Sequence, residues 1–446
     1  MPWPYRHIEL GDENVPFYML RFAATGSILS PLARQALISD LGQGGYTHVF
    51  ICAHGWNTTF RAAQSRYQQF VAGYHAFRQE HNLTFATPYR PLVIGITWPS
   101  ISLLLPGEQP PRIAATAHAS GLADTEDVSR MVAEVAGLVP GEQAGRLREL
   151  AGWESLDSPD ATELAGLLAL AYSAGDQDGD DEAIPVTPAT VLSVWQDLQD
   201  TGPDGPESFH APLDDLPQHT DTPGPRAAAR VRLDPRPILR AVTVCRMKDR
   251  AGVVGRGGVA PLLADVLATS PAATHLVGHS YGCRVLLTAL SSGALPRQAS
   301  SLLLLQPAVN YLCFATQVPK TGRPGGFRPA LDRVRQPVLA TFSAKDAALH
   351  AFFHLAVRRR ADLGEPKIAA PGRVPSRYCA LGGWGPGGMT DGEAAESTLL
   401  AYPHRYDLAP GGPVRVYGVR ADAGIGGHSD VINDFTFWAL YNQVTG

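Results

Sequence analysis

The chain has few cysteines, and their arrangement argues against two common uses of this residue. Its 446 residues include five cysteines. The number is odd, the positions are widely spaced and no two form a CxxC pair, so neither a disulfide framework nor a zinc site is indicated. We therefore expect most of them to be buried thiols: Cys52, Cys245, Cys283, Cys313 and Cys379.

Two further kinds of segment are missing. No run of basic residues is interleaved with aromatic ones, and 37 Lys and Arg stand against 42 Asp and Glu, so nucleic-acid binding has no support. The first residues, Met1 to Arg6, lack the charged and apolar regions of a signal peptide. No apolar stretch approaches the roughly 18 residues that a membrane helix needs. We therefore expect a cytoplasmic protein without a transmembrane segment.

Short apolar runs alternate with helical patterns in two parts of the chain. Before residue 100, the runs at 17–22, 48–53 and 92–97 predict strands, with a helix from Thr58 to Glu80 between the last two. The runs are continuous rather than alternating, which is typical of parallel strands covered on both faces. After residue 240 the same pattern returns, with strands at 274–277, 301–305, 338–342 and 414–419 and helices at 260–267, 283–290, 347–358 and 431–441. This order predicts an α/β protein with a doubly wound, mostly parallel sheet.

The stretch 101–240 interrupts this alternation. Apolar residues recur at helical spacing near 128–135, 164–171 and 191–198, so we predict a large, mainly helical insertion. An acidic run and a proline-rich tract predict a flexible part at about 175–237. The acidic run fails the template of a calcium-binding EF-hand loop, because Asp181 stands where glycine is required. We expect a core of 1–100 and 241–446, with 101–240 as a lid or cap, or as an element that binds a protein partner.

The pentapeptide Gly278-His279-Ser280-Tyr281-Gly282 follows one of these apolar runs and precedes a predicted helix. That context is typical of a nucleophile elbow, a strand-to-helix turn so tight that residues two positions on either side of the nucleophile must be small. Gly278 and Gly282 satisfy this requirement. Ser280 is therefore the predicted nucleophile, at the carboxyl edge of the sheet.

A nucleophilic serine needs a base, and in this class of enzyme the acid and the histidine follow the serine in that order. His428 lies in a loop directly after the last predicted strand, which favours it as the base. Asp346 lies a few residues past an earlier strand and is the predicted acid. Two alternatives stay open: Asp346 could only cap the following helix, and Asp430 could replace it. Gln306, after the preceding strand, is not acidic.

Two other histidines downstream of the serine, His350 and His354, lie one turn apart in a predicted helix. This spacing would suit a metal. No Glu follows His350, as a His-Glu-x-x-His motif requires, so a place in the core is favoured.

The oxyanion of an acyl-transfer reaction needs two backbone N–H donors. One is expected from Tyr281, the residue after the nucleophile. The loop His54-Gly55-Trp56-Asn57 after an early strand is expected to supply the second, from Trp56, because Gly55 allows a close approach of the backbone. An ordinary strand-to-helix turn is the alternative for this loop. His54 is expected to be a structural hydrogen bonder rather than a base.

Several motifs together resemble a family of esterase/lipase-like α/β hydrolases of unknown physiological role. The motifs are His54-Gly55-Trp56-Asn57-Thr58-Thr59-Phe60, Thr97-Trp98-Pro99-Ser100, Arg246-Met247-Lys248-Asp249-Arg250-Ala251-Gly252, Gly278-His279-Ser280-Tyr281-Gly282 and Gly427-His428-Ser429-Asp430. The resemblance covers about residues 45–100 and 240–446. It implies the α/β-hydrolase fold and a triad of Ser280, Asp346 and His428. The insertion at 101–240 departs from the family.

These patterns predict a serine hydrolase that cleaves an ester, thioester or amide through an acyl-enzyme on Ser280, most simply as a carboxylesterase or lipase. Such chemistry requires neither a metal nor an organic cofactor, and the expected partner is a small acyl substrate. A serine peptidase or acyltransferase would use the same residues. A binding or scaffold module that keeps this fold without turnover is the alternative from another class.

Overall fold

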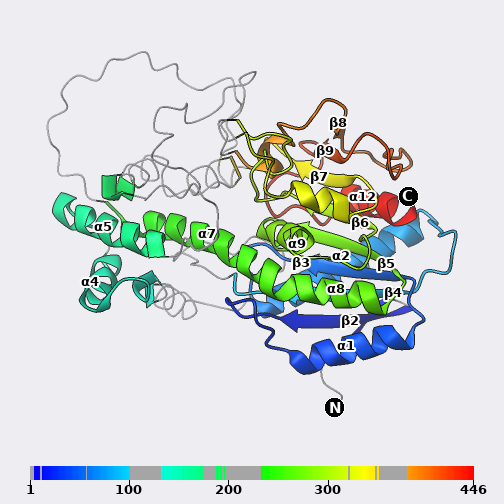
Figure 1. Ribbon diagram of the computed structural model, residues 1–446, viewed down its shortest axis with the longest axis horizontal. Coiled ribbons are helices and arrows are strands. Elements are labelled where there is room, and N and C mark those ends of the chain that lie inside the picture. The colour runs from blue at the N-terminus through cyan, green and yellow to red at the C-terminus, as the bar shows by residue number, and fades with distance from the viewer. Residues whose placement is uncertain are drawn as a thin grey trace. The chain divides into compact units, whose positions relative to one another are not determined.

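The computed structural model of the chain describes residues 5–10, 13–56, 58–100, 132–133, 135–153, 155–174, 187–189, 191–192, 195, 233–319, 322–346, 349–350 and 379–446 (Figure 1). Most of the helix predicted at 347–358, and most of the segment predicted to be flexible at 175–237, lie outside these residues. Two compact units are distinguished. The first comprises Met1–Ile101, Met247–His354 and Lys367–Gly446, and the second comprises Ser102–Arg246 and Leu355–Pro366.

The first unit is built on a nine-stranded sheet in the order β1-β2-β4-β3-β5-β6-β7-β9-β8. Every neighbouring pair is parallel except β1 with β2. The strands are β1 Tyr5–Leu10, β2 Glu13–Arg21, β3 His48–Ala53, β4 Pro91–Thr97, β5 Ala273–His279, β6 Ser301–Leu305, β7 Val338–Phe342, β8 Ala394–Thr398 and β9 Val416–Arg420. The α/β class and the mostly parallel sheet predicted from the sequence are confirmed.

The central strands are buried along their whole length, as their continuous apolar sequences predict. All residues of β3, β6 and β7 are buried, and β4 and β5 are buried after their first residue. Successive side chains of a strand point to opposite faces of its sheet, so such strands need cover on both faces.

Two groups of helices provide this cover. One group contains α2 (Phe60–Glu80), which contacts β4, and α12 (Asp434–Thr445), which contacts α2 and β6. The other contains α1 (Pro31–Gln43), α8 (Ala260–Thr269) and α9 (Tyr281–Ser291), in which α8 contacts both of the others (Figure 1). The described residues of this unit also form three short helical segments: a π-helix Gly255–Val259, a 3₁₀ helix Arg328–Arg333 and α11 Leu381–Trp384.

Local sequence explains where the two helices of the first group begin. The Thr59 side chain accepts a hydrogen bond from Ala62 N–H and so caps the start of α2. Asn433 and Thr436 form a capping box at the start of α12, in which each side chain bonds the other residue's backbone N–H. The chain therefore enters α12 directly after the loop that contains His428.

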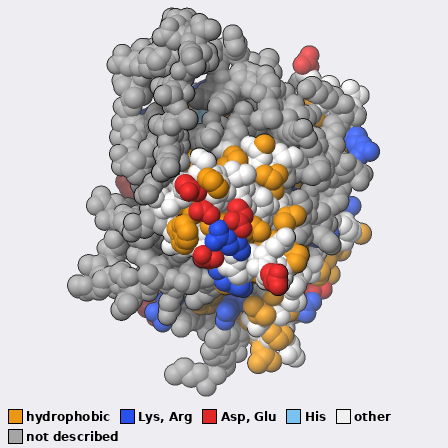
Figure 2. Space-filling view, turned by 90° about the vertical axis from the view of Figure 1, so that its left-hand side faces the viewer, with side chains coloured by type: hydrophobic (Ala, Val, Ile, Leu, Met, Phe, Trp, Pro, Cys, Tyr) orange, Lys and Arg blue, Asp and Glu red, His pale blue; other side chains and the backbone are white. Residues whose placement is uncertain are grey.

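Within the second unit, α4 (Gly141–Ala151) contacts α5 (Ser158–Ala174). The Arg146 side chain on α4 pairs with Glu149, Asp160 and Glu163, which joins the two helices. Figure 2 shows charged side chains of both signs among hydrophobic ones on one face of the molecule. The Arg146 pairs are partly exposed to solvent, and ion pairs that water can reach contribute little to stability.

One helical run resembles a membrane span, although none was predicted from the sequence. Met247–Thr269 includes the end of α7 (Pro235–Val254), the π-helix and α8, and it is long and apolar enough to cross a membrane by length and composition. Of its most apolar window, 61% is buried inside the protein, as in the core helix of a soluble protein. The run is therefore weak evidence for a membrane span.

Candidate active site

Ser280 lies in a strained turn between β5 and α9. Its backbone has φ 54° and ψ −126°, and the residue is 3% exposed. Residues other than glycine rarely adopt a positive φ, and they keep this conformation only where surrounding contacts enforce it. Here the Ser280 N–H donates to Leu305 O at 3.1 Å, and the Ser280 carbonyl accepts from Cys283 N at 3.0 Å. The turn is therefore tied to the end of the neighbouring strand β6.

Three glycines leave no room for a side chain around this turn. A Cβ on Gly282 would overlap the Ala53 carbonyl at the end of β3. On Gly278 it would lie 2.9 Å from Cys283 N, and on Gly55 it would lie 2.7 Å from the Ser280 Cβ. The two glycines expected from the pentapeptide therefore occur where the backbone is crowded, and the His54–Trp56 loop lies directly against the serine.

The structure brings together the three residues predicted as nucleophile, base and acid. Ser280 Oγ lies 2.7 Å from His428 Nε2, and His428 Nδ1 lies 2.8 Å from Asp346 Oδ2. With the imidazole proton on Nδ1, the serine hydroxyl donates to Nε2 and Nδ1–H donates to the carboxylate. Each residue follows the carboxyl end of a strand, β5, β7 or β9, and this shared edge explains how segments so distant in sequence meet.

Asp346 is completely buried and accepts three hydrogen bonds. Besides His428, its Oδ2 accepts from Gln306 Nε2 at 2.8 Å, and its Oδ1 accepts from Leu349 N at 3.0 Å. The last bond comes from a backbone N–H three residues later, as in a helix cap, but most of the helix predicted there lies outside the described residues, so the capping role stays a prediction. Asp430 instead accepts from Gly426 N at 3.0 Å, which closes the loop around His428.

His54 is held as a neutral imidazole. Its Nδ1–H donates to Gly55 O at 2.8 Å, and its Nε2 accepts from Trp98 N at 3.4 Å. Burial lowers the His54 pKa to about 4, and the ring stacks on Trp98 with centroids 5.7 Å apart. This geometry agrees with the expected structural role and fixes which nitrogen bears the proton.

The bond from His54 also orients the peptide that is expected to contribute to an oxyanion hole. A trans peptide points its C=O and N–H in opposite directions. Because the Gly55 carbonyl points to His54, the Trp56 N–H points away from that ring. The other expected donor, Tyr281 N–H, belongs to the first residue of α9, where the helix dipole favours negative charge. Asn57 of the same loop lies outside the described residues.

His279, which was not predicted as part of the site, supports the loop that contains His428. His279 Nε2 donates to His428 O at 2.7 Å, and the two rings lie 5.0 Å apart. Burial, and then the positive charge of Arg66, hold the His279 pKa well below its usual value, so this imidazole is neutral. Arg66 on α2 donates to Ser429 O at 2.9 Å. No sequence pattern marks these contacts, because both are made to backbone carbonyl groups of a distant loop.

His350 is partly buried and lies against α11. Its Nε2–H donates to Ser343 O at 3.2 Å, and its ring lies 5.0 Å from that of Trp384. His354 lies outside the described residues. In the described part of the chain, no group of three or more His, Cys, Asp and Glu side chains could hold a metal ion.

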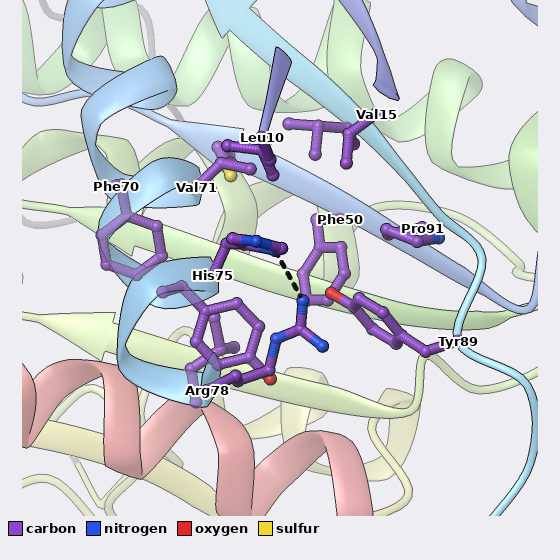
Figure 3. Close-up of a pocket in the computed structure, with 13 residues that line it drawn as sticks. Leu10, Val15, Phe50, Phe70, Val71, His75, Arg78, Tyr89 and Pro91 are labelled. Carbon is purple, nitrogen blue, oxygen red and sulfur yellow. Dashed lines mark hydrogen bonds between the residues drawn. The ribbon is translucent and has the colours of Figure 1, made fainter. Parts of the chain in front are cut away.

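A small cavity lies elsewhere, beneath α2. Figure 3 shows its apolar lining and the Arg78 guanidinium, which bonds His75 Nδ1 at 3.2 Å. Its volume of about 20 Å³ is enough for roughly one water molecule. None of Ser280, Asp346 and His428 lines it. It is too small for an acyl substrate.

Comparisons with known proteins identify no relative of this chain. No protein-family model matches the chain, and no curated protein or solved structure shows significant similarity to it.

Proposed function

We propose that the chain is a serine hydrolase of the α/β-hydrolase fold, with Ser280 as nucleophile, His428 as base and Asp346 as acid. The observation that supports this most is the serine itself: a buried residue in a strained turn whose Oγ lies 2.7 Å from an imidazole that a buried carboxylate orients. Strained residues of this kind cluster at active sites. The mostly parallel sheet, with all three residues after its strands, supports the proposed fold.

In the proposed reaction His428 Nε2 takes the Ser280 proton while Oγ attacks an acyl carbonyl. The carbonyl oxygen becomes an oxyanion, to which Tyr281 N–H and Trp56 N–H would donate. His428 then gives its proton to the leaving group, which leaves an acyl-enzyme. Water, activated by the same histidine, hydrolyses this ester and restores the serine. Asp346 stabilises the imidazolium and keeps its proton on Nδ1.

The proposed substrate is a small ester, thioester or amide with an acyl group. The same residues would serve a peptidase or an acyltransferase, in which the leaving group or the acceptor differs. The cytoplasmic location and the lid or partner-binding role of the insertion remain predictions from the sequence.

Labelling with a fluorophosphonate tests the proposal, since such probes react with activated serines. We expect one label on the wild-type protein, at Ser280, and hydrolysis of at least one member of a panel of acyl esters. Ser280→Ala should abolish labelling and lower kcat about 10³-fold or more. The matched control is Ser292→Ala, just beyond the other end of α9, which should keep both. Labelling of Ser280→Ala at another serine would contradict the assignment, and an unlabelled wild type would favour a binding module.

A further inference from the structure

Gln306 uses every hydrogen-bonding group of its side chain inside the protein. Its Oε1 accepts from Thr341 Oγ1 at 2.9 Å, and its Nε2 donates to Asp346 Oδ2 at 2.8 Å and to Gly382 O at 3.2 Å. Its backbone N–H also donates to Thr341 Oγ1, at 2.9 Å. The residue is completely buried, and its φ of 46° is the second strained conformation at this edge of the sheet.

These contacts fix which end of the amide faces the carboxylate. If the amide were turned over, Oε1 would face both the Asp346 carboxylate and the Gly382 carbonyl, and Nε2 would face the Thr341 hydroxyl. The Gln306 oxygen would then face two other acceptors with no proton between them, which is costly in a buried site that water cannot reach. Gln306 is thus held as a donor to Asp346.

The same carboxylate oxygen accepts from His428 Nδ1 and from Gln306 Nε2. A hydrogen bond to a charged group stabilises the charged form, so the Gln306 amide favours an ionised Asp346. The two donors also fix the plane of the carboxylate relative to the imidazole. The sequence indicated only that Gln306 is not an acid. Its place after β6, the neighbour of β7, is what gives it a role.

We propose that Gln306 is a positioning residue for the candidate site: its amide holds the Asp346 carboxylate turned toward His428 and stabilises the negative charge there. This inference rests on the proposed function. Its consequence concerns the pH dependence of the reaction. With His428 neutral, the His428–Asp346 pair has a net charge of −1, and with His428 protonated the pair is neutral. A donor on Asp346 stabilises the first state more, so removing that donor moves protonation of the pair to higher pH.

The test replaces Gln306 by Met, which has a similar length and no amide. We expect the midpoint of the acidic limb of kcat/KM against pH to rise by about one pH unit, which is part of the strength of one hydrogen bond to a charged group, because the bond to Asp346 is present in both states. On that limb kcat/KM should fall about tenfold, and on the high-pH plateau it should fall less. A merely structural role would lower kcat/KM by the same factor at every pH, and that result would overturn the proposal.

Three further variants control for folding and for the buried amide as such. Gln443, on α12, is equally buried and donates to Leu302 O at 2.9 Å, so Gln443→Met makes the same change away from the site. It should leave the midpoint unchanged. Thr341→Val should move the midpoint in the same direction as Gln306→Met, because the amide is no longer held, and Thr341→Ser should restore it. If Thr341→Val and Thr341→Ser give the same midpoint, Thr341 does not orient the amide.

Other charged and titratable groups near the pair are unchanged in these variants, so differences between them report on Gln306. They are Arg66 on α2, His279 as the last residue of β5, Lys345 and His350 on the segment after β7, and Asp422 and Asp430 on the segment after β9.

A second readout needs no turnover. The downfield proton resonance of His428 Nδ1–H can be followed against pH in the wild type and in Gln306→Met. We expect its midpoint to rise in the variant, and an unchanged midpoint would contradict the inference. If the wild type is inactive but the midpoint of this resonance still rises in Gln306→Met, only the proposed function is contradicted.

Discussion

Two residues other than glycine take a positive φ at the carboxyl ends of adjacent strands, and both belong to the candidate site. Ser280 follows β5 with φ 54°, and Gln306 follows β6 with φ 46°. Such conformations cost roughly 1–3 kcal/mol each and persist where surrounding contacts determine them. Here the contacts link the two turns, since the Ser280 N–H donates to Leu305 O, just before Gln306. Both strained residues contact the same histidine–acid pair: Ser280 contacts His428, and Gln306 contacts Asp346.

At the residue scale, the bond from His54 to Gly55 O makes a prediction about the oxyanion peptide. His54→Phe keeps a ring against Trp98 but removes the Nδ1–H donor, so the Gly55–Trp56 peptide is free to turn. We expect kcat to fall about 10²-fold, as for the loss of one oxyanion donor, with a smaller change in KM. His54→Asn, whose amide can replace Nδ1–H, should recover part of the rate. Steady-state kinetics on one acyl ester checks this, and equal rates for the two variants would contradict it.

Ser280, His428 and Asp346 could be predicted as candidates because short-range signals mark them: glycine spacing for the serine, and a position just after a strand for the other two. Gln306, His279 and Arg66 could not. Their contacts depend on which strand ends are neighbours and on where a distant loop places its carbonyl groups, and neither is encoded near the residue. A polar side chain directly after a strand, as at Gln306, was the one usable signal.

At the element scale, the elbow depends on close contact between the first turn of α9 and the end of β3. A Cβ at Gly282 would meet the Ala53 carbonyl, which is backbone of a central strand and has little freedom to move. We expect Gly282→Ala to lower the free energy of unfolding by about 1–3 kcal/mol and to slow labelling of Ser280, because the turn must open. Gly145→Ala on α4 is the control: a Cβ there meets nothing within 4 Å, and alanine favours a helix. Urea unfolding measures the stability of both variants. An equal loss of stability in Gly282→Ala and Gly145→Ala would contradict the prediction.

The sequence predicted the central strands well and the edges poorly. β3, β4, β6 and β7 each contain a continuous apolar run, and β5 contains a shorter one, because both faces of these strands are covered. β8 at one edge is only half buried, and its sequence Ala-Ala-Glu-Ser-Thr has no apolar run to distinguish it from a loop. β1 at the other edge was missed as well. Edge strands bury less surface, so pairing to a neighbour decides them more than composition does.

At the scale of the whole molecule, burial of histidines ties stability to pH. His48 Nδ1 and His275 Nε2 lie 3.1 Å apart at the amino ends of β3 and β5. Burial lowers the His48 pKa to about 4 and the His275 pKa to about 3. Burial likewise lowers the pKa values of His54, His279 and His350. The folded protein thus keeps five imidazoles neutral at pH values where an unfolded chain would protonate them.

The sign of the effect follows from proton linkage. Between the folded and unfolded pKa values the unfolded state binds more protons, so stability is fully present above about pH 6.5 and falls as pH decreases. Between these two pKa values, each such histidine lowers the free energy of unfolding by about 1.4 kcal/mol for every pH unit of acidification. We expect the free energy of urea unfolding to be several kcal/mol lower at about pH 5 than at about pH 7.5. Glu393, whose pKa Arg328 lowers to about 2, contributes only below this range.

His48→Phe isolates one histidine from this total. The His48 ring packs against Phe85, Tyr89 and His275, so phenylalanine fits the surroundings. The variant loses the contact with His275 at every pH, so its stability at about pH 7.5 should be lower than that of the wild type. The difference in stability between about pH 7.5 and about pH 5 should nevertheless shrink by roughly 2 kcal/mol, because one proton fewer is taken up on unfolding. An unchanged difference would mean that His48 is protonated in the folded protein near pH 5, against the direction of its pKa shift.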